Sequence, residues 1–307
     1  MKHYGAIEAG GTKFVCAVGT EKGEIIDRLT IPTETPEETI GKLTDFFSKY
    51  QLTSMGVGSF GPISVAKDKE DYGYITNTPK LAWKGYPFIP ELEKRLGIPV
   101  SFTTDVNAAA LGELTKGAAQ GLESCLYITV GTGIGAGAIV GGRLVQSTLH
   151  PEMGHLLIRR HPHDTFEGIC PYHKDCLEGM ASGPALEKRW GKKGNDLAEN
   201  EEVWEIEADY LAQALMQYIL ILCPEKIIMG GGVMKQQQLF PLIRKKLAEY
   251  MNGYVDLPDL EGYIVPPGLG DDQGITGALA LAYEAGGASW VVKSTQSERI
   301  TAVRLKA

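Results

Sequence analysis

The sequence lacks the features of a membrane-spanning or secreted protein. None of its apolar runs approaches the roughly 18 residues that a membrane-spanning helix needs. The N-terminal stretch MKHYGAIEAGGTKF also has no apolar segment before its first glycine turn, where a signal peptide would carry one. We therefore expect a cytoplasmic protein with no membrane partner.

Clusters of basic residues are also missing. The chain has 307 residues, with 30 Lys and Arg against 38 Asp and Glu, for a formal net charge of −8. Its basic runs, EKRWGKKG and IRKKLAEY, are short and contain acids. Nucleic-acid affinity depends mostly on clustered Lys and Arg, so we expect no nucleic-acid partner.

Cysteine is scarce and scattered. An odd number of five argues against a disulfide framework. Only Cys170 and Cys176 are close in sequence, within HPHDTFEGICPYHKDC at 161–176, which also contains three histidines. This stretch is either a metal site or a group of free thiols and surface imidazoles.

A possible internal repeat is the main sign of domain organisation. The hairpin pattern YGAIEAGGTKFVCAVGTEKGEIIDRLTI returns as CLYITVGTGIGAGAIVGGRLVQ, and an offset of 122 places Val18 on Val140 and Gly11 on Gly133. A duplicated α/β unit predicts two similar domains with a cleft between them. The alternative is that two unrelated glycine-rich hairpins align by chance.

The expected boundaries follow from this repeat. We predict an N-terminal α/β domain over 1–115 and a larger C-terminal α/β domain over 116–271, with a helix near 272–286 that could return to the first domain. The tail at 288–307 carries no motif that indicates a role. Within the first domain, Thr35, Pro36 and the acids after them predict a helix start, because they form a cap, an N1 proline and an acidic first turn.

Three glycine-rich turns follow apolar strands: EAGGTK at 8–13, GTGIGAG at 131–137 and GGGV at 230–233. Glycine allows positive φ and close backbone approach, so successive N–H groups can converge on phosphate oxygens. Any one of these turns alone is more typical of a plain hairpin. Three in one chain favour phosphate binding.

Asp105 is the best candidate for a catalytic carboxylate. Phosphoryl transfer needs a group that accepts the proton of the attacking hydroxyl, besides positioning and charge neutralisation. Asp105 follows the expected strand PVSFTT and opens the expected helix VNAAALGELTKG. The alternative is an ordinary N-cap aspartate for that helix.

Taken together, the motifs resemble a known family. IEAGGTK, GVGSFGP, TTDVNAAALGE, VGTGIGAGAIVGGRL, PEMGH, CLEGMASGPAL and IIMGGGV occur in the order and spacing of the ROK sugar kinases, and most closely of the bacterial fructokinases among them. The resemblance runs from about residue 5 to about residue 285. It implies the actin-like, ribonuclease-H-like α/β fold of two domains around a central cleft, and transfer of phosphate from Mg-ATP to a sugar.

The resemblance also implies residue roles. Asp105 resembles the general base. Nucleotide and phosphate contacts are implied for Glu8, Gly10, Gly11, Thr12, Lys13, Gly131, Thr132, Gly133, Pro184, Gly230, Gly231, Gly232 and Val233. Sugar contacts are implied for Gly61, Asn77, Thr104, Asp105, Glu152, His155 and Glu178.

Two positions depart from the family's usual pattern. Glu8 stands where Asp is usual, and its longer carboxylate could still orient a magnesium-bound water. Thr104 stands where the glucokinases have a sugar-binding Asn. This difference argues against glucose and favours fructose, with mannose next.

The family resemblance also bears on the Cys and His cluster. It implies a zinc site of one His and three Cys, to which His155, Cys170 and Cys176 correspond. His173 stands where the family often has the third Cys, so we expect His155, Cys170, His173 and Cys176 as the ligands. Two Cys and two His complete a tetrahedral zinc shell with no open position, so we expect a structural metal and not a catalytic one. His161 and His163 are rival ligands, which we expect to remain solvated.

We therefore expect an ATP-dependent kinase, with Mg²⁺ and a structural Zn²⁺, that phosphorylates D-fructose at the 6-hydroxyl. Mannose, glucose and an N-acetylated amino sugar are alternative substrates. A non-catalytic sugar sensor is an alternative of another class. Sensors of the family carry a DNA-binding segment ahead of the kinase-like body, for which the strand expected from Tyr4 leaves no room. The resemblance also suggests a homodimer.

Overall fold

The structure, a computed structural model, describes residues 2–287, so the tail at 288–307 lies outside the described residues. The chain forms two compact units. The first unit takes the described residues of Met1–Glu123, Gly141–His150 and Gly268–Ala307, and the second takes Ser124–Val140 and Pro151–Pro267. Among the described residues, no helix combines the length and the apolar character needed to cross a membrane.

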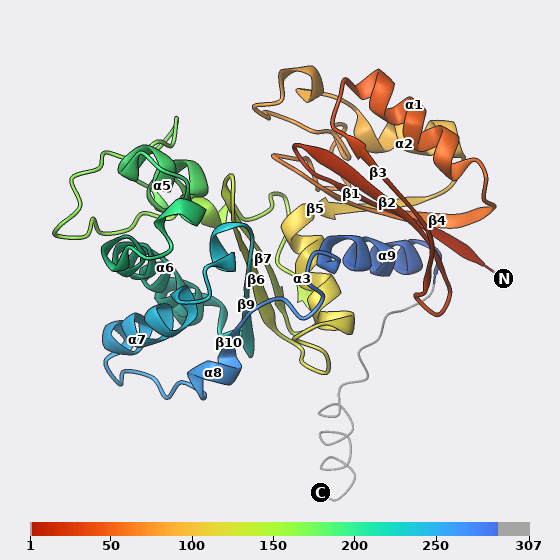
Figure 1. Ribbon diagram of the computed structural model, residues 1–307. Helices are drawn as coiled ribbons and strands as arrows, with labels where there is room; N and C mark the ends of the chain where they lie inside the picture. The colour runs from red at the N-terminus through yellow and green to blue at the C-terminus, as the bar shows by residue number, and fades with distance from the viewer. Residues whose placement is uncertain (1, 288–307) are drawn as a thin grey trace, which may run out of the picture. The chain divides into compact units, whose positions relative to one another are not determined.

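The first unit contains a five-stranded sheet (Figure 1). Its order is β3-β2-β1-β4-β5, with β1, β2 and β3 antiparallel and β1, β4 and β5 parallel. The strands are β1 (His3–Ala9), β2 (Lys13–Thr20), β3 (Ile25–Pro32), β4 (Leu52–Ser59) and β5 (Val100–Thr104).

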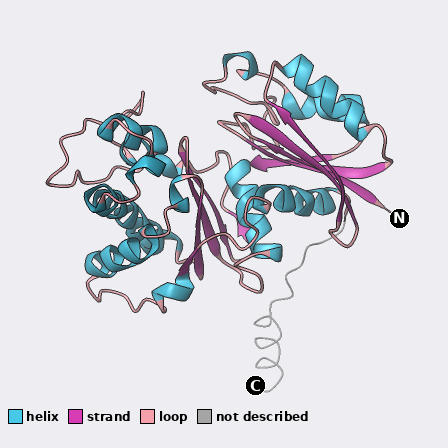
Figure 2. Cartoon of the chain, viewed as in Figure 1, coloured by secondary structure: helices cyan, strands magenta, loops and turns pink. Residues whose placement is uncertain are grey.

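Helices cover both faces of this sheet (Figure 2). They are α1 (Pro36–Phe47), η1 (Leu81–Trp83), α2 (Phe88–Leu96), α3 (Asp105–Lys116) and α9 (Gln273–Ala285). One core joins α1 and α2 to side chains such as Ile7 and Phe14, and another joins α9 to Tyr4, Ala6 and Ala17. Successive strand residues point to opposite faces, which is why alternate residues of β1 enter different cores.

The start of α1 has the form that the sequence predicts. Thr35 is the N-cap, Pro36 is in the first turn, and Thr35 and Glu38 form a reciprocal capping box. This arrangement satisfies backbone N–H groups that the first helical turn leaves without partners.

Glycines allow α9 to pack closely within the first unit. A Cβ on Gly277 would lie 1.7 Å from the Ala108 carbonyl oxygen, and one on Gly112 would lie 2.0 Å from the Gln273 carbonyl oxygen. Because those distances are far inside van der Waals contact, larger residues would force α3 and α9 apart.

The two units differ in their limits from the predicted domains 1–115 and 116–271, because residues 116–123, 141–150 and 268–271 belong to the first unit. The buried carboxylate of Glu113, on α3, accepts hydrogen bonds from the backbone N–H groups of Ala118 (2.6 Å), Gly268 (3.0 Å) and Leu269 (3.1 Å). One side chain therefore holds the segment after α3 and the segment before α9 together. Because this contact joins residues that are far apart in the sequence, no local sequence pattern marks the limit of the first unit.

The second unit contains a sheet with the order β10-β9-β6-β7-β8. The strands are β6 (Cys125–Val130), β7 (Ile134–Val140), β8 (Arg143–Leu144), β9 (Lys226–Gly230) and β10 (Ile264–Val265). The helices are η2 (Met153–His155), α4 (Leu177–Ala181), α5 (Gly183–Trp190), η3 (Gly194–Leu197), α6 (Glu201–Leu222), η4 (Val233–Lys235), α7 (Leu239–Met251) and α8 (Leu260–Tyr263).

The two sheets have the same strand order and directions where their pairings are resolved. In each, an antiparallel hairpin is followed across the sheet by parallel strands. The internal repeat is thus present in the topology. The single offset of 122 is wrong along the full hairpin, because Ala9 pairs with Phe14 across four turn residues while Val130 pairs with Ile134 across three.

Candidate active site and metal centre

Asp105 is the first residue of α3, directly after β5. The helix cap is Thr104, whose side chain accepts a hydrogen bond from the Asn107 N–H at 3.2 Å. The alternative of Asp105 as the N-cap is therefore wrong. Its Oδ1 accepts from the Val106 N–H at 2.8 Å, inside the first helical turn. The positive end of the helix dipole at this place favours an ionised carboxylate.

The first glycine turn joins β1 to β2. The Gly10 N–H donates to the Lys13 carbonyl at 2.9 Å, and a Cβ on Gly10 would lie 2.8 Å from that oxygen. Thr12 and Lys13 are exposed at the tip. The side chain of Lys80 also reaches this turn, since a Cβ on Gly11 would lie 3.7 Å from Lys80 Cε. No sequence motif marks Lys80 as a residue of this turn.

Glu8 lies among other carboxylates of the first unit. Burial, followed by the charge of Asp105, raises its pKa from 4.5 to about 7, and Asp272 and Asp271 raise it further while Lys13 lowers it. Asp272 also forms an ion pair with Arg28 at 2.8 Å. No motif predicts a role for Asp271 and Asp272, and the only sequence signal is that they are adjacent acids before an apolar helix.

Two further polar residues of the first unit were missed. His150 Nε2 accepts a hydrogen bond from the Ile63 N–H at 3.2 Å, close to Gly61, and Gln146 contacts Thr103 and Asn107 on either side of Asp105 in sequence. Asn77 is exposed. Thr104 is 5% exposed, with its oxygen engaged as the helix cap.

The second unit has a cavity of about 480 Å³ at its glycine turns. Among the residues predicted to bind nucleotide, it is lined by Gly131, Thr132, Pro184, Gly231, Gly232 and Val233. Gly133 and Gly230 do not line it. Lys193, Asn195 and Gln236 do, and no motif marked them. The volume falls in the range of small-ligand sites.

Backbone geometry explains the glycines of this cavity. Gly231 has φ of +94°, and a Cβ there would lie 2.4 Å from the Val130 carbonyl oxygen. The Gly183 N–H donates to the Gly131 carbonyl at 2.8 Å, which joins the start of α5 to the second glycine turn. Only glycine permits this conformation and this approach together.

Glu178 contacts the second glycine turn. Its Oε2 accepts from the Ile134 N–H at 2.9 Å, and a Cβ on Gly133 would lie 2.7 Å from the same oxygen. A Cβ on Gly154 would lie 1.8 Å from the Ile134 carbonyl oxygen, so the PEMGH segment also lies against the start of β7. Glu152 is exposed, and His155 turns toward the Cys and His cluster.

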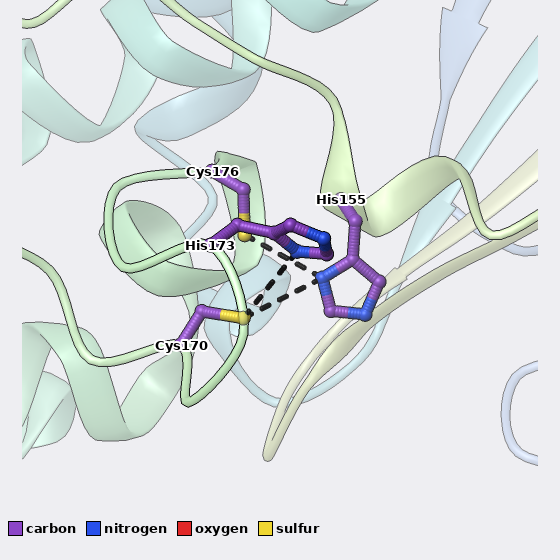
Figure 3. Close-up of side chains that lie close together, drawn as sticks. All are labelled: His155, Cys170, His173 and Cys176. Carbon is purple, nitrogen blue, oxygen red and sulfur yellow. Dashed lines mark hydrogen bonds between the residues drawn. The ribbon is translucent and has the colours of Figure 1, made fainter.

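The four predicted metal ligands meet in one cluster (Figure 3). His155 Nδ1 lies 3.5 Å from Cys176 Sγ and 3.7 Å from Cys170 Sγ, and Cys170 Sγ lies 3.8 Å from His173 Nδ1. A tetrahedral zinc with Zn–S of about 2.3 Å and Zn–N of about 2.0 Å sets its N and S ligands about 3.5 Å apart. The side chains therefore fit zinc.

The chemistry of the cluster agrees with this fit. Both cysteines are buried and form no disulfide, and burial raises the pKa of the Cys176 thiol to about 11. Zinc binds cysteine as the thiolate, so binding of the metal would release the proton of this thiol. Gly168 and Gly179 allow the tight turn around Lys174, since a Cβ on either would lie about 2 Å from the Lys174 carbonyl oxygen.

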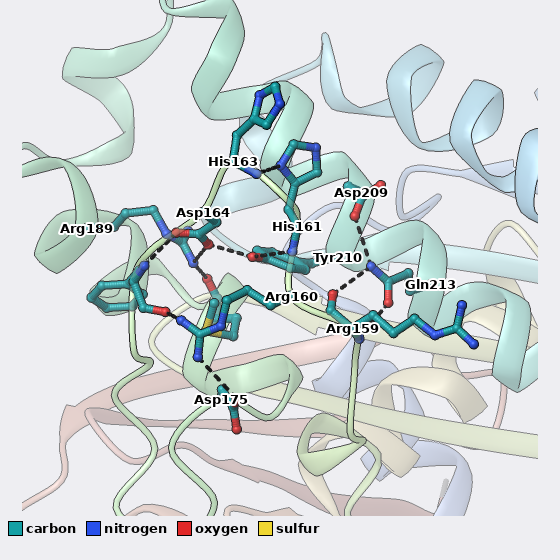
Figure 4. A network of polar contacts seen from close by, with 12 residues as sticks. Arg159, Arg160, His161, His163, Asp164, Asp175, Arg189, Asp209, Tyr210 and Gln213 are labelled. Atoms are coloured by element: carbon teal, nitrogen blue, oxygen red, sulfur yellow. Dashed lines mark hydrogen bonds and ion pairs between the residues drawn. The ribbon is translucent and has the colours of Figure 1, made fainter.

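His161 and His163 are not among the four clustered residues. They belong to a separate network of polar contacts (Figure 4). The His163 N–H donates to His161 Nδ1 at 3.3 Å. The neighbouring Asp164 is buried, and it binds Arg189 at 3.1 Å and the Tyr210 hydroxyl at 2.5 Å. This pairing joins the loop to α5 and α6.

Comparison with known proteins supports one family. The ROK family model matches residues 4–285. The chain is 59% identical to a Bacillus subtilis (strain 168) protein provisionally named fructokinase, over 92% of this chain and 95% of that protein. It is 50% identical to the fructokinase of Pediococcus pentosaceus, over 92% of this chain and 98% of that protein.

The fold is similar to that of solved ROK structures. The ROK hexokinase of Thermus thermophilus matches with a TM-score of 0.78 and 27% identity, over 92% of this chain and 98% of that one. The two sheets of equal topology thus correspond to the actin-like fold of these kinases. Because the family model covers nearly all of the described residues, the chain belongs to the ROK family.

Proposed function

We propose that the protein is a fructokinase, which transfers the γ-phosphate of ATP to the 6-hydroxyl of D-fructose and releases ADP and fructose 6-phosphate. The observation that carries this proposal is the identity of 59% and 50% with proteins named fructokinase, along nearly their whole length. The carboxylate and the glycine turns supply the groups that such a transfer requires.

Asp105 is the proposed general base. Its carboxylate accepts the proton of the 6-hydroxyl as the oxygen attacks the phosphate. Its place at the start of α3 supports this role, because the helix favours the ionised form and the β5-to-α3 junction fixes the reach of the side chain. The sugar contacts proposed with it are Gly61, Asn77, Thr104, Glu152, His155 and Glu178.

The glycine turns are the proposed nucleotide site. Residues 10–13 and 131–133 offer backbone N–H groups to phosphate oxygens, and Lys13 adds a positive charge. The cavity lined by Pro184 and Gly231–Val233 would hold the adenosine. Gly230, the last residue of β9, directly precedes these glycines and is proposed as a nucleotide contact with them. A magnesium ion bound with ATP would neutralise phosphate charge, and Glu8 is the carboxylate proposed to orient one of its waters.

The proposed zinc is structural. Four protein ligands leave no open position for a substrate. The ion would join His155 to Cys170, His173 and Cys176, and so fix the segments that carry Glu152 and Glu178. We also propose that two copies of the chain form a homodimer.

Mannose, glucose and N-acetylated amino sugars are the competing substrates, and a non-catalytic sensor is the competing class. The named relatives favour fructose over the other sugars. The deciding experiment measures ADP release from Mg-ATP with fructose, mannose, glucose and N-acetylmannosamine. We expect the highest kcat/KM for fructose. If the protein bound a sugar but turned over none of the four, this result would overturn the proposal of a kinase and favour a sugar sensor.

A further inference from the structure

Residues 145–150 form a strap that lies against the part of the first unit that carries Asp105. The strap has two polar anchors. Gln146 Oε1 accepts from the Thr103 hydroxyl at 2.8 Å and from Asn107 Nδ2 at 3.2 Å, while His150 Nε2 accepts from the Ile63 N–H at 3.2 Å. The anchors therefore contact the carboxyl end of β5, the first turn of α3 and the segment after β4.

The network determines which way the Gln146 amide points. Asn107 Nδ2 also donates to Thr103 Oγ1 at 3.0 Å, so the proton of that hydroxyl is directed at Gln146 Oε1. Thr103 and Asn107 are almost fully buried, which holds both donors in place. With two donors at Oε1, the Nε2 group of Gln146 must point away from them.

Gln146 Nε2 is an open donor. It makes no hydrogen bond within residues 2–287, and it is not among the buried polar atoms of that range that lack a partner. Gln146 itself is half-buried. An amide whose oxygen is doubly bound and whose nitrogen faces solvent is oriented in advance for a ligand that accepts hydrogen bonds.

The partners of Gln146 lie close in sequence to Asp105. Gln146 contacts the residues two before and two after Asp105, whereas the Thr104 oxygen between them is used to cap α3. The 6-hydroxyl of fructose is free in the furanose form, in which O5 belongs to the ring. The nearest other hydroxyl to the 6-hydroxyl is then the one on C4.

We propose that Gln146 determines sugar specificity by donating a hydrogen bond from Nε2 to the 4-hydroxyl of fructose. This inference rests on the proposed function, because it places the 6-hydroxyl at Asp105. A site that hydrogen-bonds a substrate hydroxyl discriminates strongly against analogues that lack it, since the protein group is left without a partner.

Two substitutions separate the donor from the anchor. Gln146→Glu keeps an oxygen for Thr103 and Asn107 but replaces the N–H donors with a second acceptor. Gln146→Leu removes both parts without adding charge. Both should lower kcat/KM for fructose about ten-fold or more, mainly through KM. Ser147→Ala, an exposed neighbour on the strap, is the matched control and should behave as the wild type.

A substrate analogue tests the contact itself. The wild type should lose about ten-fold in kcat/KM with 4-deoxyfructose, whereas Gln146→Leu should lose little further. The analogue 2,5-anhydromannitol, which lacks the anomeric hydroxyl, should affect the wild type and the variant equally. The contact would be overturned if Gln146→Glu kept the KM of the wild type. It would also be overturned if the wild type and Gln146→Leu lost equally in kcat/KM with 4-deoxyfructose.

Failure of the proposed function gives a different pattern. If the wild type does not turn over fructose, the fructokinase proposal fails. The affinity of the protein for each of the four sugars, measured by calorimetry, then decides the role of Gln146. Weaker binding of the preferred sugar by Gln146→Glu, with unchanged thermal unfolding, supports a sugar contact. Unchanged affinity, or no sugar binding by the wild type, overturns it.

Discussion

Asp105 is the residue on which the proposed chemistry depends most directly. We expect Asp105→Asn to lower kcat by about 10²- to 10⁴-fold, because a neutral amide cannot accept the proton of the 6-hydroxyl. Fructose affinity should change little, since the amide keeps the shape of the side chain. Steady-state kinetics and calorimetry would measure the two effects separately.

A surface aspartate of the same unit gives the control for this prediction. Asp45 is exposed on α1, and Asp45→Asn should retain wild-type kinetics. A large loss of sugar affinity in Asp105→Asn, together with a small loss of kcat, would contradict the assignment of the base.

Glu8 links the pH dependence of stability to function. Its folded pKa of about 7 lies above the ordinary 4.5, mainly because the carboxyl group is buried and lies near Asp105. Between these values the folded state holds a proton that the unfolded state releases, so stability falls as pH rises from 4.5 to 7. We expect Glu8→Gln to stabilise the fold at pH 8 by on the order of 2 kcal/mol, and not at pH 4.5.

Thermal unfolding at both pH values measures this effect. The same substitution should lower kcat/KM for Mg-ATP, because the carboxylate proposed to orient the metal-bound water is gone. Glu70 is exposed, and Glu70→Gln should leave both stability and kinetics unchanged. Equal shifts in unfolding temperature at pH 4.5 and pH 8 would show that the pKa of Glu8 is not raised.

At the scale of elements, the loop that carries the Cys and His cluster should depend on zinc. We expect about one zinc per purified chain, and a lower unfolding temperature after chelation, because a structural metal contributes its binding free energy to folding. Cys176→Ser should lose the metal, whereas His163→Ala should keep it, since His163 lies outside the cluster. Elemental analysis decides this, and zinc lost equally from both variants would contradict the ligand set.

The packing of α3 against α9 gives a second prediction at this scale. Gly277→Ala should destabilise the protein by about 2 kcal/mol or more, because the new methyl group would meet the Ala108 carbonyl oxygen. Gly41 lies inside α1, and a Cβ there would meet nothing within 4 Å. Gly41→Ala should therefore stabilise the helix by about 0.5–1 kcal/mol.

Thermal unfolding would show a lower unfolding temperature for Gly277→Ala and a higher one for Gly41→Ala. If both shifted in the same direction, the close approach of α9 to α3 would not be the cause. The contrast also shows why glycine is hard to interpret in a sequence. Gly41 and Gly277 both lie inside helices, and only the neighbouring element tells them apart.

At the scale of the whole molecule, we expect sedimentation to give about twice the chain mass of 33.3 kDa, as a homodimer requires. Dilution over a hundred-fold range should leave that mass unchanged if the dimer is stable. A single species of 33.3 kDa would contradict the homodimer and leave the proposed kinase chemistry of one chain intact.

The sequence by itself determined those features whose physical cause is local. The cap of Thr35, the glycine turns after β1 and β6, and the spacing of Cys170, His173 and Cys176 depend on neighbours within a few residues. The family resemblance extended these local motifs to an overall fold and a candidate chemistry.

Tertiary structure decided what depends on distant contacts. Glu113 set the limits of the first unit by binding backbone groups more than 150 residues away, and Gln146 reached Thr103 and Asn107 across about 40 residues. The two hairpin turns also differ in length, so the single offset of 122 does not align both strands of the two hairpins. Such pairings arise from packing and hydrogen bonding between separate elements, and residue periodicity along the chain does not encode them.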